Sequence, residues 1–405
     1  MAVFFIPLFF QKERNTIHTP CGGLTFTLSI HIRMSEDRLY LIALSMSKGL
    51  GPVLIRNLVA FCGSVKKVLE TPRGKLGKVP GIGEKTIDAI LKARTLLPFA
   101  EQEIKRSEKY NVELLCYLDK AYPQHLKFIH DAPIILYKKG NIDFNAQPSI
   151  ALVGTRTPTE YGKKMTALFA DFFAKQGVNI VSGLAYGIDM TAHKTVLAEN
   201  GITTAVLAHG LDTIYPPTHQ EKAVEMLEKG GWLSEYAFGT KPDTAHFPAR
   251  NRIVSGMSKA IIVIEAAEKG GALITARSGF EQNREVYALP GNVGNLFSEG
   301  CNKLIRENIA KLVTHPQEVL EDLEIQWLEY KAKVSESPDA IMPFPNIPLS
   351  ADETLVLNLL RNSELQIDNI AIQAGLPIAT INSLLLMMEF KGLVAVMPGK
   401  KYRLQ

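Results

Sequence analysis

The sequence has few cysteines, few tryptophans and little net charge. Its 405 residues include two Trp, four Cys and a formal net charge of +4. The cysteines Cys21, Cys62, Cys116 and Cys301 are scattered, with no CxxC pair and no histidine at metal spacing. Reduced thiols of a cytoplasmic protein are therefore expected, rather than disulfides or a metal site. Because the bulk charge is weak, a nucleic-acid ligand requires basic residues concentrated in one place.

Long apolar runs and the common nucleotide-binding motifs are also missing. No run approaches the roughly 18 apolar residues of a membrane helix, so no membrane partner is expected. A Walker A sequence is absent, as is GxGxxG with a following acidic residue after the first predicted strand. ATP, NAD and other cofactors are therefore not expected. The length and the ordinary globular composition indicate two to three domains.

The first 33 residues differ from the rest of the chain. Residues 1–10 are apolar (MAVFFIPLFF) but lack the basic n-region and the small-residue cleavage site of a signal peptide. An amphipathic helical pattern begins after Met34, as at a natural protein start. We expect 1–33 to be a disordered or non-native extension that is dispensable, with a functional segment as the alternative.

Residues 34–110 are predicted to form a helical, SAM-like domain with a helix-hairpin-helix motif. Apolar residues recur at helical spacing and are interrupted at Gly49-Leu50-Gly51-Pro52 and at Val79-Pro80-Gly81-Ile82-Gly83. After the second break, the next helix offers free N–H groups to a phosphate. The alternative is a packing unit with no phosphate contact.

Residues 111–322 alternate short apolar strands with helical segments, which predicts an α/β domain with a parallel sheet covered on both faces. Ligands of such sheets bind at the carboxyl ends of the strands, near a topological switch point. The expected strands are Ser149–Val153, Val178–Ser182, Thr203–Ala208, Trp232–Glu235, Ala260–Glu265 and Glu285–Leu289.

A proline-rich linker is expected over 323–348, followed by a winged-helix domain over 349–405. Three helical segments and a glycine-turn hairpin give the winged-helix pattern. This segment holds five acidic and five basic residues, and its third helix, near Ile378–Phe390, has no Lys or Arg. We therefore expect a protein-contact or dimer module rather than an independent DNA reader.

Three predicted strand ends carry glycine-bearing loops. Glycines let backbone N–H groups approach an anion, hydroxyls can donate to phosphate oxygens, and an arginine can grip one bidentately. Three such loops on one sheet favour phosphate binding over glycines that only permit tight turns. The candidate residues are Gly154, Thr155, Arg156, Ser182, Gly183, Gly271 and Thr275.

A fourth segment, Phe247-Pro248-Ala249-Arg250-Asn251-Arg252, combines an aromatic ring, two guanidinium groups and an amide. Such a mixture can stack a base while holding its backbone. The alternative is a helix start with solvated charges.

The order and spacing of many short motifs resembles the DNA-processing protein A (DprA, or Smf) family over about residues 120–315. The motifs include Val153-Gly154-Thr155-Arg156, Ser182-Gly183-Leu184-Ala185-Tyr186-Gly187-Ile188-Asp189, Tyr215-Pro216, Phe247-Pro248-Ala249-Arg250-Asn251-Arg252-Ile253, Leu273-Ile274-Thr275-Ala276 and Leu289-Pro290-Gly291.

The resemblance implies an extended Rossmann-like domain that binds single-stranded DNA without catalysis. It also implies a homodimer and a partnership with RecA recombinase, which the protein helps to load onto incoming DNA during transformation. Gly270-Gly271-Ala272 departs from the family's usual Ser-Gly-Ser, which removes two hydroxyl donors, so the resemblance implies backbone contacts but no hydroxyl contacts at 270 and 272. The implied DNA contacts are Arg156, Ser182, Gly183, Lys241, Phe247, Arg250, Asn251 and Thr275.

Two other classes of function compete with this interpretation. A nucleotide phosphoribohydrolase on a related fold would need a PGGxGT loop and a catalytic glutamate, which Gly270-Gly271 and Glu281 match poorly. A purely structural assembly protein would not retain DNA at all. Asp189 and His193, at i and i+4 of one predicted helix, are interpreted as a helix-start residue and a structural partner rather than a catalytic or metal pair.

Overall fold

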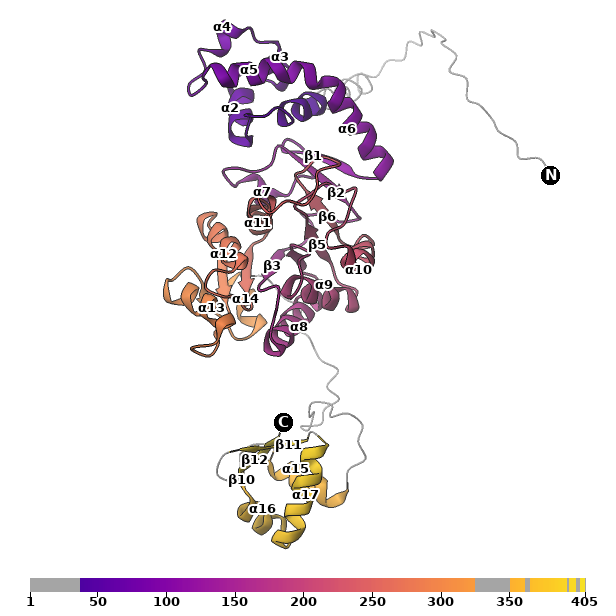
Figure 1. Ribbon diagram of the computed structural model, residues 1–405, viewed down its shortest axis with the longest axis vertical. Coiled ribbons are helices and arrows are strands. Elements are labelled where there is room, and N and C mark those ends of the chain that lie inside the picture. Colours follow the sequence, from indigo (N-terminus) through magenta and orange to yellow (C-terminus); the bar gives the residue numbers. More distant parts are fainter. Residues whose placement is uncertain (1–36, 325–349, 361–364, 392, 398–400, 405) are drawn as a thin grey trace, which may run out of the picture. The chain divides into compact units, whose positions relative to one another are not determined.

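The computed structural model describes residues 37–324, 350–360, 365–391, 393–397 and 401–404. Its contacts divide the chain into two units, Met1–Leu328 and Glu329–Gln405, which are described separately (Figure 1). The expected extension 1–33 and nearly all of the expected linker 323–348 lie outside the described residues.

A nine-stranded sheet in the order β1-β2-β6-β5-β4-β3-β7-β8-β9 forms the centre of the first unit. Neighbours from β6 to β9 are parallel, whereas β2 runs antiparallel to both β1 and β6. The α/β Rossmann-like fold is thereby confirmed, with an antiparallel edge that the sequence analysis did not predict. The strands are β1 (Glu113–Cys116), β2 (Ile135–Lys139), β3 (Ser149–Val153), β4 (Asn179–Ser182), β5 (Thr203–Val206), β6 (Gly231–Ser234), β7 (Ala260–Val263), β8 (Glu285–Ala288) and β9 (Lys311–Leu312).

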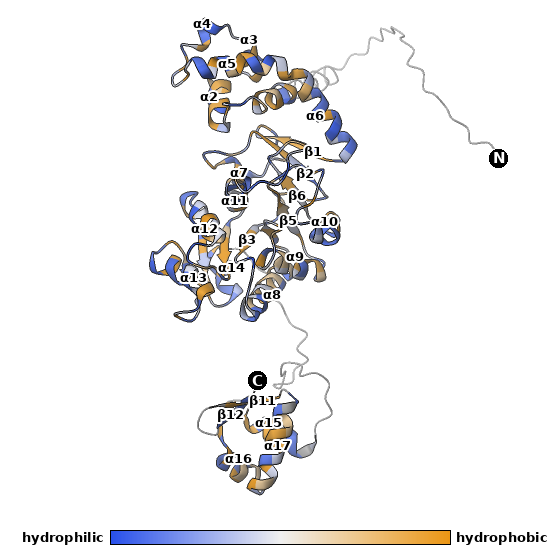
Figure 2. Ribbon diagram, in the orientation of Figure 1, coloured by the Kyte–Doolittle hydropathy of each residue, from blue (hydrophilic) through white to orange (hydrophobic). Residues whose placement is uncertain are grey.

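Helices cover both faces of this sheet because alternate strand residues point in opposite directions. Ile150 and Leu152 of β3 pack in one hydrophobic cluster with Phe169 of α8, together with residues of α9 and α14. Ala151 packs in another cluster with Ile253 of α11 and with residues of α7, α12 and α13. Hydrophobic residues dominate the strands in Figure 2. The helices are α7 (Gln124–Lys127), α8 (Glu160–Lys175), α9 (Ile188–Ala198), α10 (Gln220–Glu225), α11 (His246–Met257), α12 (Gly271–Glu281), α13 (Leu296–Arg306) and α14 (Pro316–Asp322), with the short 3₁₀ turn η2 (Pro217–His219).

The N-terminal part of this unit is helical and shares a core with the antiparallel edge of the sheet. One hydrophobic cluster extends from Leu41 and Ile90 to Leu114 of β1 and Trp232 of β6. The buried Glu103 carboxylate reinforces the junction by accepting hydrogen bonds from the Tyr137 hydroxyl (3.0 Å) and the Phe238 N–H (2.8 Å). The elements are a helix over 37–45, α2 (Pro52–Cys62), α3 (Val65–Glu70), α4 (Arg73–Leu76), α5 (Glu84–Ala93), η1 (Arg94–Leu96) and α6 (Leu97–Tyr110).

The second unit is the winged helix that the sequence predicts. Three helices pack around a small core that includes Ile370, Ile381 and Leu385, and a three-stranded sheet in the order β10-β12-β11 completes it. Within the described residues no single helix can span a membrane by length and apolarity; α16 and α17 pass that test only as a pair bent by 111°. The elements are α15 (Ala351–Leu360), β10 (Leu365–Gln366), α16 (Ile367–Ala374), α17 (Ile378–Phe390), β11 (Val394–Met397) and β12 (Lys401–Leu404).

Candidate nucleic-acid interface

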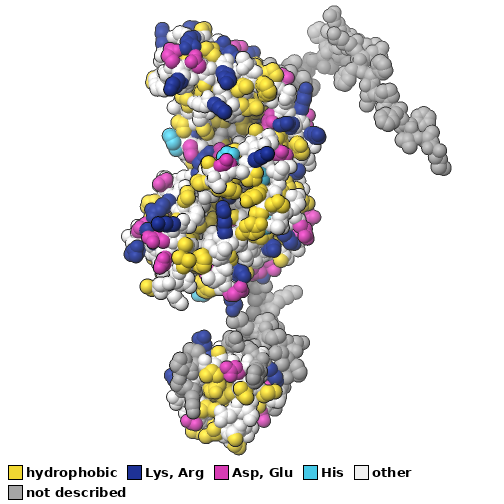
Figure 3. All heavy atoms as spheres, in the orientation of Figure 1, with side chains coloured by type: hydrophobic (Ala, Val, Ile, Leu, Met, Phe, Trp, Pro, Cys, Tyr) yellow, Lys and Arg dark blue, Asp and Glu magenta, His cyan; other side chains and the backbone are white. Residues whose placement is uncertain are grey.

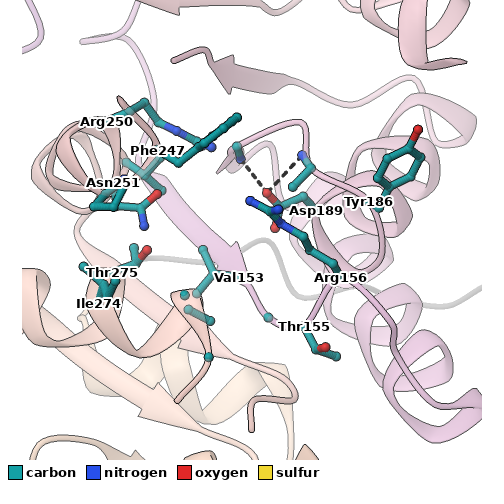
Figure 4. A pocket seen from close by; sticks show the side chains of 18 of the residues that line it. Val153, Thr155, Arg156, Tyr186, Asp189, Phe247, Arg250, Asn251, Ile274 and Thr275 are labelled. Carbon is teal, nitrogen blue, oxygen red and sulfur yellow. Dashed lines mark hydrogen bonds between the residues drawn. The ribbon is translucent and has the colours of Figure 1, made fainter. Parts of the chain in front are cut away.

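A pocket of about 680 Å³ lies at the carboxyl ends of β3, β4 and β7. From β3 the chain passes through α8 to β4 on one side, while β7 is added on the other side, so the strand order changes direction at β3. A crevice at such a switch point is the usual ligand site of an open parallel sheet. Figure 4 shows side chains from the loops after β3 and β4, from α11 and from α12 around this pocket.

The loop after β3 is held in place by β7 and its C-terminal extension. The Thr155 N–H donates to the Glu265 carbonyl oxygen (2.8 Å). The buried Glu265 carboxylate accepts hydrogen bonds from the N–H of Thr159 (2.9 Å) and from its hydroxyl (2.5 Å). Gly162, in the first turn of α8, leaves the space that this carboxylate occupies. Arg156 therefore projects from a fixed loop, and its guanidinium lies 5.4 Å from the centroid of the Phe247 ring.

The loop after β4 is organised by a buried carboxylate. Asp189, in the first turn of α9, accepts hydrogen bonds from the N–H groups of Gly183 (3.0 Å) and Ala185 (3.3 Å), drawn as dashed lines in Figure 4. Burial raises the pKa of Asp189, and the positive charge of Arg250 opposes that rise. The Ser182 hydroxyl points into the sheet and donates to the Leu152 carbonyl oxygen (2.7 Å). Asp189 thus fixes the backbone of a loop that lines the pocket.

Helix α11 supplies the aromatic and basic side chains of the opposite wall. Arg250 is 4% exposed, and its Nε has no hydrogen-bond partner among the described residues. Burial lowers the pKa of Arg250 to about 10, which Asp189 opposes and Arg156 reinforces. The guanidinium lies where a Cβ at Gly183 would be, so only glycine fits at this position without a shift of Arg250. Arg252 lies on the other side of the helix and pairs with Asp131 and Glu235.

His193, on α9, does not line the pocket. It is fully buried, and its Nδ1 is 2.7 Å from the Thr203 hydroxyl of β5. Burial lowers its pKa to about 3, so the imidazole is neutral at physiological pH. Within the described residues no group of three His, Cys, Asp or Glu side chains is arranged to hold a metal ion.

A family model for the DNA recombination-mediator protein A matches residues 113–324, which is more than half of the chain. The chain belongs to this family. A DprA winged-helix model matches residues 341–400, in agreement with the second unit. The protein Smf of Synechocystis sp. is 34% identical over 396 residues, which cover 91% of this chain and 99% of that relative.

The solved structure of a DprA protein from Streptococcus pneumoniae shares the fold. The X-ray structure of DprA from Streptococcus pneumoniae is 33% identical, with a TM-score of 0.62, and the match covers 70% of this chain and 97% of that one. A Helicobacter pylori DprA structure, which describes that protein's single-stranded-DNA binding mode, is 30% identical, with a TM-score of 0.49 and coverage of 54% and 97%.

Nine of the eleven residues predicted for the DprA-type site line the pocket. The two exceptions are Ser182, whose hydroxyl is turned into the sheet, and Lys241, which is exposed in the loop before α11. The nine are Gly154, Thr155, Arg156, Gly183, Phe247, Arg250, Asn251, Gly271 and Thr275.

Two tyrosines of the pocket were missed as site residues by the sequence reasoning. The Tyr215 ring is 6.3 Å from that of Phe247, and Tyr186 packs edge-on against His219 at 4.7 Å. Both tyrosines belong to motifs that carry the DprA resemblance, and both are half exposed. An aromatic residue inside such a glycine-rich or proline-containing loop was the available signal.

Proposed function

We propose that this DprA-family chain binds single-stranded DNA at the strand-end pocket and acts, without catalysis, in DNA processing during transformation and recombination. The observation that carries the proposal is Arg250, a buried cation whose Nε has no hydrogen-bond partner among the described residues. Leaving a buried donor unpaired costs about 1–3 kcal/mol. A phosphate entering the pocket would supply an acceptor and a negative charge beside Arg250 and the exposed Arg156.

The aromatic rings of the pocket favour a single strand over free phosphate or a duplex. The Phe247 ring has the Arg156 guanidinium 5.4 Å and the Tyr215 ring 6.3 Å from its centroid. Bases of a single strand are free to stack on such rings, whereas bases of a duplex are already stacked on one another. The pocket therefore combines phosphate anchors with a stacking surface.

The lining residues give little support to the phosphoribohydrolase alternative. Asp189 is the only carboxylate among them, and it accepts hydrogen bonds from two backbone N–H groups. A glycosidic-bond hydrolase needs a carboxylate that reaches the sugar. Asp189 is instead committed to holding the loop after β4.

The family resemblance supports the remaining parts of the proposal. We propose RecA recombinase as a protein partner, a homodimer as the assembled form, and the cytoplasm as the place of action. Each of these rests on the resemblance and not on a contact in the structure.

The test is a mobility-shift series with a single-stranded oligonucleotide at increasing salt, together with incubation of the protein with nucleoside monophosphates. We expect retention of the oligonucleotide that weakens with salt, and no released base. Failure to retain the strand at low salt, or release of free base, would contradict the proposal.

A further inference from the structure

The N-terminal helical region contains the same Gly-apolar-Gly turn twice. Gly49-Leu50-Gly51 precedes α2, and Gly81-Ile82-Gly83 precedes α5. The first glycine of each turn has positive φ (+94° and +77°), and the second is an extended N-cap of a helix that has no side-chain cap. The two turns are thus copies of one local structure, and the second is the turn at which the sequence predicts a helix-hairpin-helix.

The first turn packs against the helix that the second turn begins. The Ser47 hydroxyl donates to the Ala89 carbonyl oxygen of α5 (2.8 Å), and a Cβ at Gly49 would lie 4.0 Å from that of Ala89. Leu50 is buried between its two exposed glycines. The apolar part of this turn therefore faces the core, while its glycine backbone faces solvent.

The surface around the turns is the most basic part of the chain. Residues 64–94 hold eight Lys or Arg and three Asp or Glu, a surplus of five, whereas the whole chain has a net charge of only +4. All eight basic residues are exposed. Figure 3 shows several of the Lys and Arg side chains of the N-terminal helical region at the surface, beside a few acidic ones. The positive charge that a nucleic-acid ligand requires is concentrated here.

Few of these charges are neutralised by ion pairs. The acids Glu84 and Asp88 both pair with Arg73, and Glu70 lies 4.0 Å from Lys66. Lys85 and Lys92 precede and follow Ala89 by four and three residues, so they lie on the face of α5 that meets the first turn. We define the paired-turn surface by the four exposed lysines near the two turns that form no ion pair with a described residue: Lys48, Lys78, Lys85 and Lys92.

We propose that the paired-turn surface is a second nucleic-acid site and that it binds the phosphate backbone of double-stranded DNA. The two turns and the four lysines lie within residues 47–60 and 64–94, which contain no Phe, Tyr or Trp. The exposed Phe61 lies at the opposite end of α2 from the first turn, so the turns lack adjacent rings on which a single strand stacks. Lysines and exposed backbone N–H groups are instead the contacts that hold a duplex by its phosphates, independent of sequence. Two equivalent turns beside each other fit a duplex, because each turn can contact one of its two sugar-phosphate backbones. The inference does not depend on the function proposed for the pocket.

The test compares two full-length variants with the same loss of charge. The first is Lys48→Ala/Lys78→Ala/Lys85→Ala, and the control Lys105→Ala/Lys120→Ala/Lys194→Ala removes three exposed lysines outside residues 64–94. Binding to duplex and to single-stranded oligonucleotides is measured by anisotropy across a salt series. Each duplex phosphate contact contributes about 0.9 to the steepness of log K against log salt. We therefore expect the slope for the first variant to be shallower by about 2.7 than that of the parent, and its duplex affinity to be at least tenfold lower.

The same variant should bind single strands within about threefold of the parent, and the control variant should bind both ligands like the parent. Equal duplex affinity of the two variants would overturn the proposal, as would a parent protein that binds no duplex at low salt. An equal loss for both ligands would overturn it as well, because the surface would then extend the single-strand path. Arg156→Ala separates the sites, since it should weaken single-strand binding alone.

Discussion

We propose that Arg156 and Phe247 hold different parts of the ligand, a phosphate and a base respectively. The guanidinium of Arg156 is exposed and projects from a loop that Glu265 fixes, so its removal should leave the fold intact. We expect Arg156→Ala to weaken single-strand binding about ten- to a hundredfold, because a charge-assisted contact contributes about 1.5–3 kcal/mol. The slope of log K against log salt should also fall by about 0.7. Arg106→Ala, which removes an exposed arginine of α6, is the control, and binding of Arg156→Ala at the parent's affinity would place the DNA elsewhere.

Phe247→Ala should weaken the same binding without changing its salt dependence. Stacking of one base on an aromatic ring contributes about 1–3 kcal/mol and releases no counterion. The matched control is Phe128→Ala, since the Phe128 ring is 81% exposed and does not line the pocket. Anisotropy titrations at several salt concentrations measure both quantities. A changed slope with unchanged affinity at low salt would argue against stacking.

Gly183 and Arg250 should behave as a coupled pair, because a methyl group at Gly183 occupies the place of the Arg250 guanidinium. We expect Gly183→Ala to reduce single-strand affinity nearly as much as Arg250→Ala. The double variant should then bind no more weakly than the worse single variant, whereas independent sites would give additive losses. A double-mutant cycle on binding free energy measures this. Additive losses would show that the Gly183 backbone and the Arg250 side chain contact the DNA separately.

At the scale of secondary-structure elements, His193 links α9 to β5 and makes the sheet sensitive to acid. Its pKa is about 3 in the folded chain and about 6.5 when unfolded, so the unfolded chain binds more protons between these values. The contribution of neutral His193 to the free energy of unfolding is complete above pH 6.5. It is lost as the pH falls, so the free energy of unfolding is lower by about 2 kcal/mol at pH 5. Urea unfolding at pH 7 and pH 5 should show this loss in the parent and a smaller one in His193→Gln. His130→Gln, which replaces an exposed histidine, is the matched control.

The buried parallel strands could be predicted from sequence to within one or two residues. Runs such as Ile150 to Val153 are apolar on both faces, and only a strand between two layers of helices needs that pattern. The antiparallel β1 and β2 were missed although they are as long as the parallel strands. Glu113 begins β1 at an exposed position, and the partly buried Lys138 and Lys139 end β2, so neither strand is an apolar run throughout. The pattern of a strand does not say which way its last hydroxyl points, so Ser182 was assigned to the pocket although it bonds to Leu152. The burial of Arg250 followed from tertiary packing alone.

For the whole molecule, the separate second unit raises the question of whether it holds DNA by itself. The charges of the five basic and five acidic residues of 349–405 cancel, and α17 carries no Lys or Arg. Lys391 is paired with Glu353 at 2.6 Å. We therefore expect the isolated 349–405 fragment to show no detectable DNA binding near physiological salt. The fragment has its own hydrophobic core, and circular dichroism would verify that it is folded. Micromolar binding in anisotropy would identify the tail as a DNA reader.

The packing of Gly162 against Glu265, which holds the loop after β3, constrains how both positions can evolve. Any side chain at position 162 would collide with the Glu265 carboxylate, and a shorter residue at 265 would release Thr159 and open space beside the glycine. Neither position can drift alone without disturbing the loop that presents Arg156. Among descendants of the ancestral gene, the two should therefore be inherited as a pair, and a lineage that replaces one should carry a compensating change at the other.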